Sequence, residues 1–166
     1  MKKQKGFTLV ETLLYIALFT IIIGGGIVAV YQIIQSTEAS YSHVILQEEA
    51  NFLFRKIDWA LTGLDGPTSI ITPTNYSDTT LTVNKDSAQV KFYLDNGNLT
   101  VQRDSGTIVP LNSSNITASS TPSTHLFERI ITPGKPDAIT TNFTLTTEQN
   151  SWPATQTFSF TKYLRR

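Results

Sequence analysis

The chain has 166 residues, in which 13 Lys and Arg balance 13 Asp and Glu, and it contains no cysteine. The absence of cysteine excludes disulfide bonds, thiol catalysis and cysteine-ligated zinc sites. The balanced charge argues against nucleic-acid binding, because phosphate recognition needs clustered positive charge.

The N-terminus combines a basic segment with a long uncharged run. Lys2, Lys3 and Lys5 come first, and residues 12–34 carry no charge. At ~1.5 Å per residue in a helix, this run can cross a hydrocarbon core ~30 Å thick once. Lysine-rich flanks resist translocation, so we expect a cytoplasmic N-terminus and an extracytoplasmic remainder. Glu11 lies at the start of the apolar segment, where a buried charge costs at least ~2.5 kcal/mol and therefore needs a partner.

The segment Gly6-Phe7-Thr8-Leu9-Val10-Glu11 resembles, without a gap, the motif at the membrane border of type IV prepilins and type II secretion pseudopilins. The resemblance implies that prepilin peptidase, a membrane aspartyl peptidase, cuts between Gly6 and Phe7 and that the new Phe7 amine is N-methylated. It also implies an assembly role for Glu11, with Thr8 in the same motif. In the family this acid pairs with the free N-terminal amine of a neighbouring subunit, which neutralises both charges in an apolar environment.

The implied partners are prepilin peptidase, other pilin or pseudopilin subunits, an inner-membrane assembly platform, and the lipid bilayer before assembly. Removal of the leader would leave the mature chain mildly acidic, and nucleic acid is not an expected partner. No cofactor and no metal are expected. Many pilins close their C-terminal region with a disulfide, so this cysteine-free chain departs from that pattern. Sheet pairing alone, or a lineage that avoids cysteine in exported proteins, would account for the difference.

The N-terminus has two simpler interpretations. A cleaved secretory signal peptide fits poorly, because the apolar region exceeds the usual ~7–15 residues and no A-x-A-like site follows it. A plain signal anchor stays open, although an anchor needs neither Glu11 nor a glycine directly before Phe7.

Three consecutive glycines, Gly24, Gly25 and Gly26, interrupt the apolar run. Each costs a helix up to ~1 kcal/mol relative to alanine, so this is the weakest point of the segment. Close packing against another membrane helix is one interpretation, although consecutive glycines lack the G-x-x-x-G spacing that builds one face. The other is a stretch that melts when the subunit leaves the membrane for a filament. Both remain open.

The helix should continue beyond the membrane as an amphipathic segment, over residues 36–64. Apolar residues recur at spacings of three and four, and Gly63, Gly66 and Pro67 should end the helix. We interpret Phe52, Phe54 and Trp59 as core or filament packing. The expected buried positions are Leu46, Ala50, Leu53, Ile57, Ala60 or Leu61, and Leu64; the expected polar positions are Glu48, Asn51, Arg55, Asp58 and Thr62.

From Ser69 onward, Thr, Ser, Asn and β-branched residues predict strands. Asn96-Gly97 separates two alternating runs and predicts a hairpin within a meander. Residues 112–124 should form a short strand around Ile116 and then an exposed loop, and 148–153 should be a second loop. The remaining strands are expected at residues 80–83, 90–94, 99–102, 107–109, 126–131, 139–145 and 158–164.

No catalytic motif is recognisable. His43 and His125 have no metal-ligand or nucleophile spacing around them. The aspartates, Asp137 among them, are mostly isolated in predicted turns. Lys162 with Arg165-Arg166 is interpreted as a solvated basic tail. The chain is therefore not expected to be an enzyme.

The sequence thus predicts an α+β, pilin-like fold in which a long N-terminal helix packs on an antiparallel β-sheet head. The expected parts are a leader at 1–6, a transmembrane and filament-core helix at 7–35, its amphipathic continuation at 36–64, and an extracytoplasmic β domain at 65–166. This arrangement resembles larger minor pilins and pseudopilins of the PilW or GspJ kind. The expected function is that of a filament subunit, and the alternative is a filament-tip binding module, such as an adhesin or DNA-uptake receptor. Basic or aromatic residues in the two loops would favour the alternative.

Overall fold

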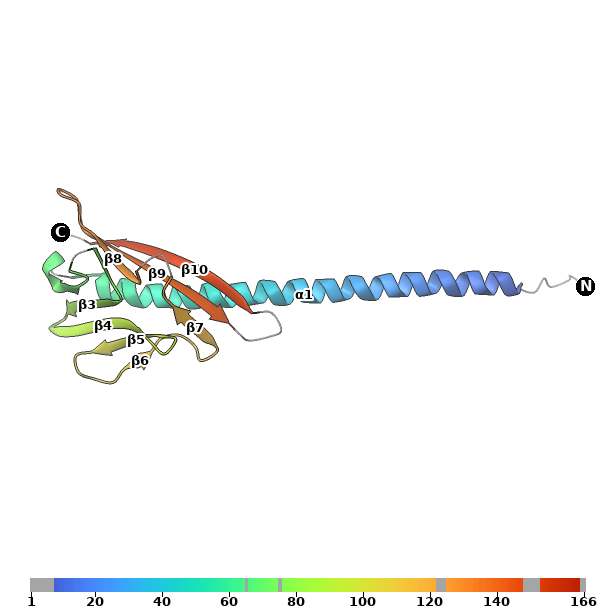
Figure 1. The fold of residues 1–166 in the computed structure, drawn as a ribbon, viewed down its shortest axis with the longest axis horizontal. Coiled ribbons are helices and arrows are strands. Elements are labelled where there is room, and N and C mark those ends of the chain that lie inside the picture. The colour runs from blue at the N-terminus through green and yellow to red at the C-terminus, as the bar shows by residue number, and fades with distance from the viewer. Residues whose placement is uncertain (1–7, 65, 75, 122–124, 148–152, 165–166) are drawn as a thin grey trace, which may run out of the picture. The chain divides into compact units, whose positions relative to one another are not determined.

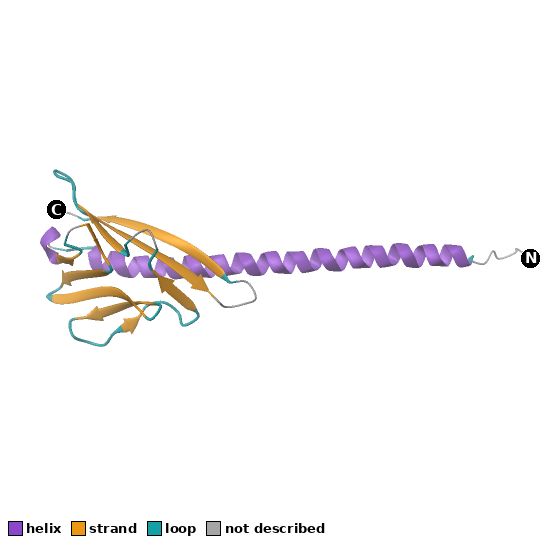
Figure 2. Ribbon diagram, in the orientation of Figure 1, coloured by secondary structure: helices purple, strands orange, loops and turns teal. Residues whose placement is uncertain are grey.

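A computed structural model describes residues 8–64, 66–74, 76–121, 125–147 and 153–164. The chain divides into two compact units, Met1–Ser40 and Tyr41–Arg166. Helix α1, Leu9–Leu61, contributes residues to both units. All strands belong to the second unit (Figures 1 and 2).

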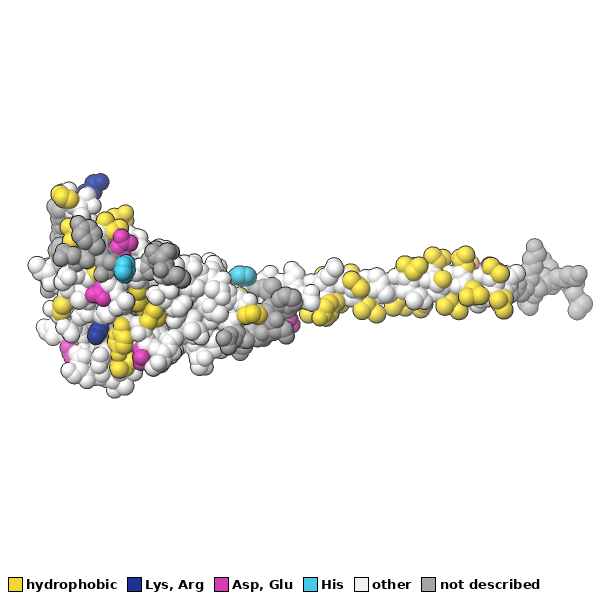
Figure 3. Space-filling model, viewed as in Figure 1, with side chains coloured by type: hydrophobic (Ala, Val, Ile, Leu, Met, Phe, Trp, Pro, Cys, Tyr) yellow, Lys and Arg dark blue, Asp and Glu magenta, His cyan; other side chains and the backbone are white. Residues whose placement is uncertain are grey.

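The first unit consists of the N-terminal part of α1, and it has no core of its own among the described residues. Large apolar side chains such as Leu9, Phe19 and Ile27 are each at least 65% exposed, and Figure 3 shows such side chains gathered along this part of the helix. An 18-residue window of α1 has a mean hydropathy of 2.5, and none of it is buried. Length and composition therefore suit α1 to cross a membrane, and the complete exposure distinguishes it from the core helix of a soluble protein.

Two threonine hydroxyls in this part of α1 donate to carbonyl groups of the preceding helical turn. The Thr20 hydroxyl donates to the Ile16 carbonyl at 2.8 Å, and the Thr37 hydroxyl donates to the Ile33 carbonyl at 2.9 Å. Such bonds spare a hydroxyl the cost of facing hydrocarbon without a partner.

In the second unit, α1 buries one apolar stripe, as the sequence predicts. Its members are Leu46, Ala50, Leu53, Ile57, Ala60 and Leu61, each at most 3% exposed. Leu64, expected on the same stripe, lies after the helix end and is only partly buried. Gly63 adopts a φ of 73°, a left-handed conformation that suits glycine just past a helix C-terminus. The short 3₁₀ helix η1, Pro67–Ser69, follows.

The first sheet is the predicted meander with one additional strand, and its last strand begins at Val109, two positions after the expected start at residue 107. Its order is β1-β3-β4-β5-β6, and the described pairings are antiparallel. Asn96 and Gly97 both have positive φ, 46° and 77°, which is the type I′ turn expected between β4 and β5. The strands are β1 Ile70–Thr72, β3 Thr80–Lys85, β4 Ala88–Asp95, β5 Asn98–Arg103 and β6 Val109–Pro110.

The second sheet has the order β10-β9-β8-β2, and β7 also pairs with β9. Ile139, Phe143 and Leu145 lie buried on one face of β9, as predicted. The strand β10 begins at Ala154, four positions before the expected 158. Two short strands, β1 and β2, had no sequence prediction of their own. The strands are β2 Tyr76–Asp78, β7 Ile116–Ser119, β8 Phe127–Ile130, β9 Ala138–Thr147 and β10 Ala154–Tyr163.

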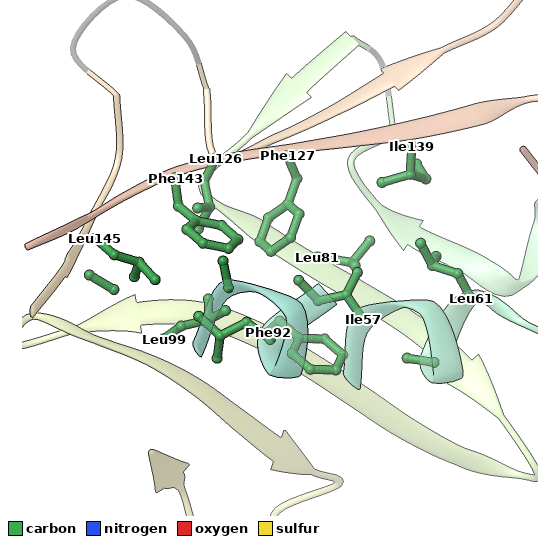
Figure 4. Packing of buried hydrophobic residues seen from close by; sticks show 14 of the residues in the cluster. Ile57, Leu61, Leu81, Phe92, Leu99, Leu126, Phe127, Ile139, Phe143 and Leu145 are labelled. Atoms are coloured by element: carbon green, nitrogen blue, oxygen red, sulfur yellow. The ribbon is translucent and has the colours of Figure 1, made fainter. Parts of the chain in front are cut away.

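Both sheets contribute side chains to one core around the buried stripe of α1. Figure 4 shows Ile57 and Leu61 of α1 among buried side chains of both sheets. Leu81, Phe92 and Leu99 come from the first sheet. Phe127, Ile139, Phe143 and Leu145 come from the second sheet, with Leu126 just before β8. A single helix thus covers both sheets.

Two ion pairs correct the sequence interpretation. The Lys162 ammonium, interpreted as part of a solvated tail, lies 2.6 Å from Asp58 Oδ1 and joins β10 to α1. Arg165 and Arg166 lie outside the described residues. Asp137, interpreted as an isolated turn residue, accepts from Arg129 Nη2 at 2.8 Å, and both side chains are nearly buried. The sequence missed both partners because each pair joins elements whose contact depends on the fold.

We expect Ile57→Ala to lower the free energy of unfolding by about 2–5 kcal/mol, because Ile57 is fully buried in the shared core. The matched control is Ile130→Ala on β8, where the side chain is 43% exposed and the loss should stay below about 1 kcal/mol. Denaturant unfolding of the full chain in detergent micelles, followed by circular dichroism, measures both. Equal losses in the two variants would contradict this packing.

Candidate functional site

The N-terminus of α1 is organised around Thr8, which directly precedes the helix. The Glu11 backbone N–H donates to Thr8 Oγ1 at 3.3 Å, and the Thr12 N–H donates to the Thr8 carbonyl at 3.2 Å. The Thr12 hydroxyl donates to the same carbonyl at 3.0 Å. Thr8 is therefore the N-cap residue of α1.

Thr8 and Glu11 have the spacing of a capping box, in which Ser or Thr at the N-cap is followed by Glu or Gln three positions later. The family resemblance assigns both residues to assembly; the T-x-x-E spacing itself indicates the cap that the structure shows. The carboxylate of Glu11 also lies in the first turn of α1, where negative charge interacts favourably with the partial positive charge of the helix N-terminus. Glu11 thus has a local structural reason to be acidic besides any contact between subunits.

The surroundings of Glu11 are apolar. Leu9, Val10, Leu13 and Leu14 are all more than half exposed, so the carboxylate lies at the edge of an otherwise apolar surface. Gly6 and Phe7, the expected cleavage and methylation positions, lie outside the described residues.

The helix runs unbroken through Gly24, Gly25 and Gly26. A Cβ atom placed on any of the three would meet no described atom within 4 Å. Alanine would therefore fit without a clash and would favour the helix by about 1 kcal/mol per position. No contact within the described chain requires glycine here, so both interpretations of the glycine run, close packing with another helix and local melting, remain proposals.

Comparison with known families gives one result. Residues 1–27 match the family model of the prokaryotic N-terminal methylation motif. This match supports a type IV prepilin-like protein. Comparison with curated proteins and comparison with solved structures give no significant match. The motif therefore identifies the N-terminal segment, and the fold of this prepilin-like chain is α+β and pilin-like, with the long helix packed on antiparallel sheets.

Residues 112–124, predicted to form a short strand and then an exposed loop, are bonded to the rest of the fold at their start. Asn112 is buried; its Oδ1 accepts from the Leu99 N–H at 2.8 Å, and its Nδ2 donates to the Ile116 carbonyl at 2.5 Å. Ser113 donates its N–H to Glu49 Oε1 on α1 at 2.6 Å. These residues therefore connect β5, β7 and α1. Residues 122–124 and 148–152 of the two predicted loops lie outside the described residues.

The two histidines lie in different parts of the chain, and both are exposed. His43 is exposed on α1, and His125 is exposed just before β8. Among the described residues, no group of three or more His, Asp or Glu could hold a metal ion. The methylation-motif family is structural, not enzymatic.

The capping role of Thr8 predicts a local effect. Thr8→Val keeps the shape of the side chain but removes the hydroxyl, which should cost about 0.5–2 kcal/mol and speed hydrogen exchange of the Glu11 amide roughly 2- to 30-fold. Thr20→Val is the control, because the Thr20 hydroxyl donates to the Ile16 carbonyl inside the helix and does not cap its N-terminus. Amide exchange measured by NMR in micelles compares the two variants. Unchanged exchange of the Glu11 amide in Thr8→Val would contradict the capping role of Thr8.

Proposed function

We propose that this prepilin-like chain is a minor pilin or pseudopilin, a structural subunit of a type IV pilus or of a type II secretion-like filament. The match of residues 1–27 to the methylation motif carries the proposal. The fully exposed apolar segment of α1 supports it, because such a surface needs lipid before assembly and other subunits afterwards.

Each part of the chain has a step in the proposed function. Prepilin peptidase cuts between Gly6 and Phe7 on the cytoplasmic side and the Phe7 amine is methylated, so that residues 1–6 form the leader. Residues 7–35 anchor the subunit in the membrane and later form the filament core. Residues 36–64 continue the helix, and residues 65–166 form the extracytoplasmic β domain. The lysines of the leader hold the N-terminus in the cytoplasm.

In this proposal, assembly at the inner-membrane platform depends on Glu11. Its carboxylate pairs with the Phe7 amine of a neighbouring subunit, so that neither charge remains alone in an apolar environment. The Thr8 cap fixes the first turn of α1 and thereby the position of the Glu11 backbone. The glycines at 24–26 give α1 a segment that opens at low cost as the subunit leaves the bilayer.

The filament-tip alternative has weaker support: of the two loops, only residues 148–153 contain an aromatic residue, Trp152, and neither contains Lys or Arg. Residues 112–124 contain no Lys, Arg or aromatic residue. Asn112 and Ser113, at the start of that segment, are bonded to other parts of the fold.

Processing is tested by co-expression of the full chain with and without a prepilin peptidase. Wild type should acquire a new N-terminus at Phe7 only when the peptidase is present, and Gly6→Ala should keep the N-terminus at Met1. Intact mass and N-terminal peptide sequencing measure both. A terminus that stays at Met1 in the wild type, or cleavage beyond the apolar run, would refute the proposal.

Assembly is tested by Glu11→Gln, which should be processed normally but fail to enter filaments, because the new amine of its neighbour loses a charge partner in an apolar environment where an unpaired charge costs at least ~2.5 kcal/mol. Glu48→Gln is the matched control, since Glu48 is exposed on the polar part of α1. Immunoblots of sheared filaments measure incorporation. Normal incorporation of Glu11→Gln would assign Glu11 to helix capping alone.

A further inference from the structure

A second stripe of α1 lies beside the buried one and is only partly covered. Phe52, Arg55, Lys56 and Trp59 follow the i, i+3, i+4, i+7 spacing of one helix face. Trp59 is 50% exposed, and Arg55 and Lys56 are exposed. The sequence pattern predicts packing positions for Phe52 and Trp59 and a polar position for Arg55.

The first sheet turns one face toward this stripe. Val90 and Phe92 on β4 pair with Arg103 and Val101 on β5, so these four side chains share a face. Val109 on β6 pairs with Val101 and extends the same face. With Leu111, these residues and the four helix residues line a groove of about 730 Å³. We call it the helix–sheet groove; it lies entirely within the second unit.

The groove has apolar walls and carries positive charge on both sides. Arg55 and Lys56 come from the helix and Arg103 from the sheet, and none of the ten lining residues is acidic. Lys85 adds a fourth cation, with its ammonium 5.4 Å from the centre of the Trp59 ring. Among the described residues, neither Arg55 nor Arg103 forms an ion pair, whereas Lys162 and Arg129 each do.

The apolar surface continues past the groove at the edge of the first sheet. Ile108 and Val109 are 45% and 48% exposed, and β6 has no strand partner on its outer side among the described residues. An occupant that covers this edge as well as the groove must be longer than a small molecule.

We propose that the helix–sheet groove binds a segment of a partner protein that carries apolar side chains flanked by carboxylates. The apolar walls take the apolar side chains, and Arg55, Lys56 and Arg103 pair with the carboxylates at the rim. Single-stranded nucleic acid fits less well, because it needs a longer basic track, and most of this lining is aliphatic or aromatic. The inference does not depend on the proposed role in a filament.

The test uses the full chain in detergent micelles with Trp152→Phe, which leaves Trp59 as the single tryptophan and the reporter of the groove. A displayed library of random peptides is selected on this protein, with removal of sequences that bind empty micelles. We expect the selected peptides to be enriched in Asp and Glu beside Leu, Phe or Trp and to shift Trp59 fluorescence to shorter wavelength. Affinity should fall about 10-fold or more in Arg55→Glu/Arg103→Glu and should weaken with added salt.

The matched control is Lys91→Glu, because Lys91 lies on β4 between two groove residues and therefore points to the opposite face of the sheet. Its affinity should equal that of wild type. Arg55→Gln/Arg103→Gln gives a second, milder test if the charge reversal disturbs folding, which circular dichroism checks. Selected peptides without acidic enrichment, or equal binding by the reversal variant, would overturn the proposal.

Two further outcomes would assign the groove to a different occupant and so reject this one. The first is Arg55-dependent binding of oligothymidine with no peptide binding, which would identify a nucleic-acid site. The second is concentration-dependent self-association in analytical ultracentrifugation that the charge reversal abolishes, which would make a second copy of the chain the occupant.

Discussion

The fold of the second unit depends on the burial of one stripe of α1 between side chains of two sheets. Each sheet is antiparallel and has one apolar face, and such a face must be covered to be stable. Ile57 and Leu53 are fully buried there. Phe54 extends the contact toward β9 and β10, with its ring centre 5.0 Å from Phe143 and 5.1 Å from Phe160. Loss of the stripe would therefore uncover both sheets at once.

The same helix carries two apolar patterns, one in each unit. Up to Ile34, large apolar side chains occur all around α1 and are exposed. From Leu46 to Leu61, one apolar stripe is buried, whereas Val44 and Trp59 stay about half exposed. A helix that is apolar on every side is stable only in lipid or among other apolar helices. The exposed part therefore requires an environment that the chain itself does not provide, whereas the second unit supplies its own.

Local patterns predicted the parts of this fold that rest on local physics. The stripe from Leu46 to Leu61 follows from helical periodicity, and the β4–β5 hairpin follows from Asn96-Gly97, whose positive φ angles suit those residues. Division of the strands into two sheets could not be predicted, because β2 pairs with β8 about 50 positions later in the chain and its three residues carry too weak a pattern. The burial of Asn112 was missed for the same reason: its partners come from β5 and β7.

The functional regions also differ in whether their residues are adjacent in the sequence or brought together only by the fold. The segment from Gly6 to Glu11 is readable from sequence because its residues are adjacent, and even the Thr8 cap follows from spacing. The helix–sheet groove is not readable, because its lining comes from α1, β4, β5 and the segment around β6. The methylation motif covers only the first 27 residues, whereas the helix–sheet groove lies in the second unit. A cationic groove without its own acidic partner is a feature there that can confer specificity, because it rejects basic partners as strongly as it attracts acidic ones.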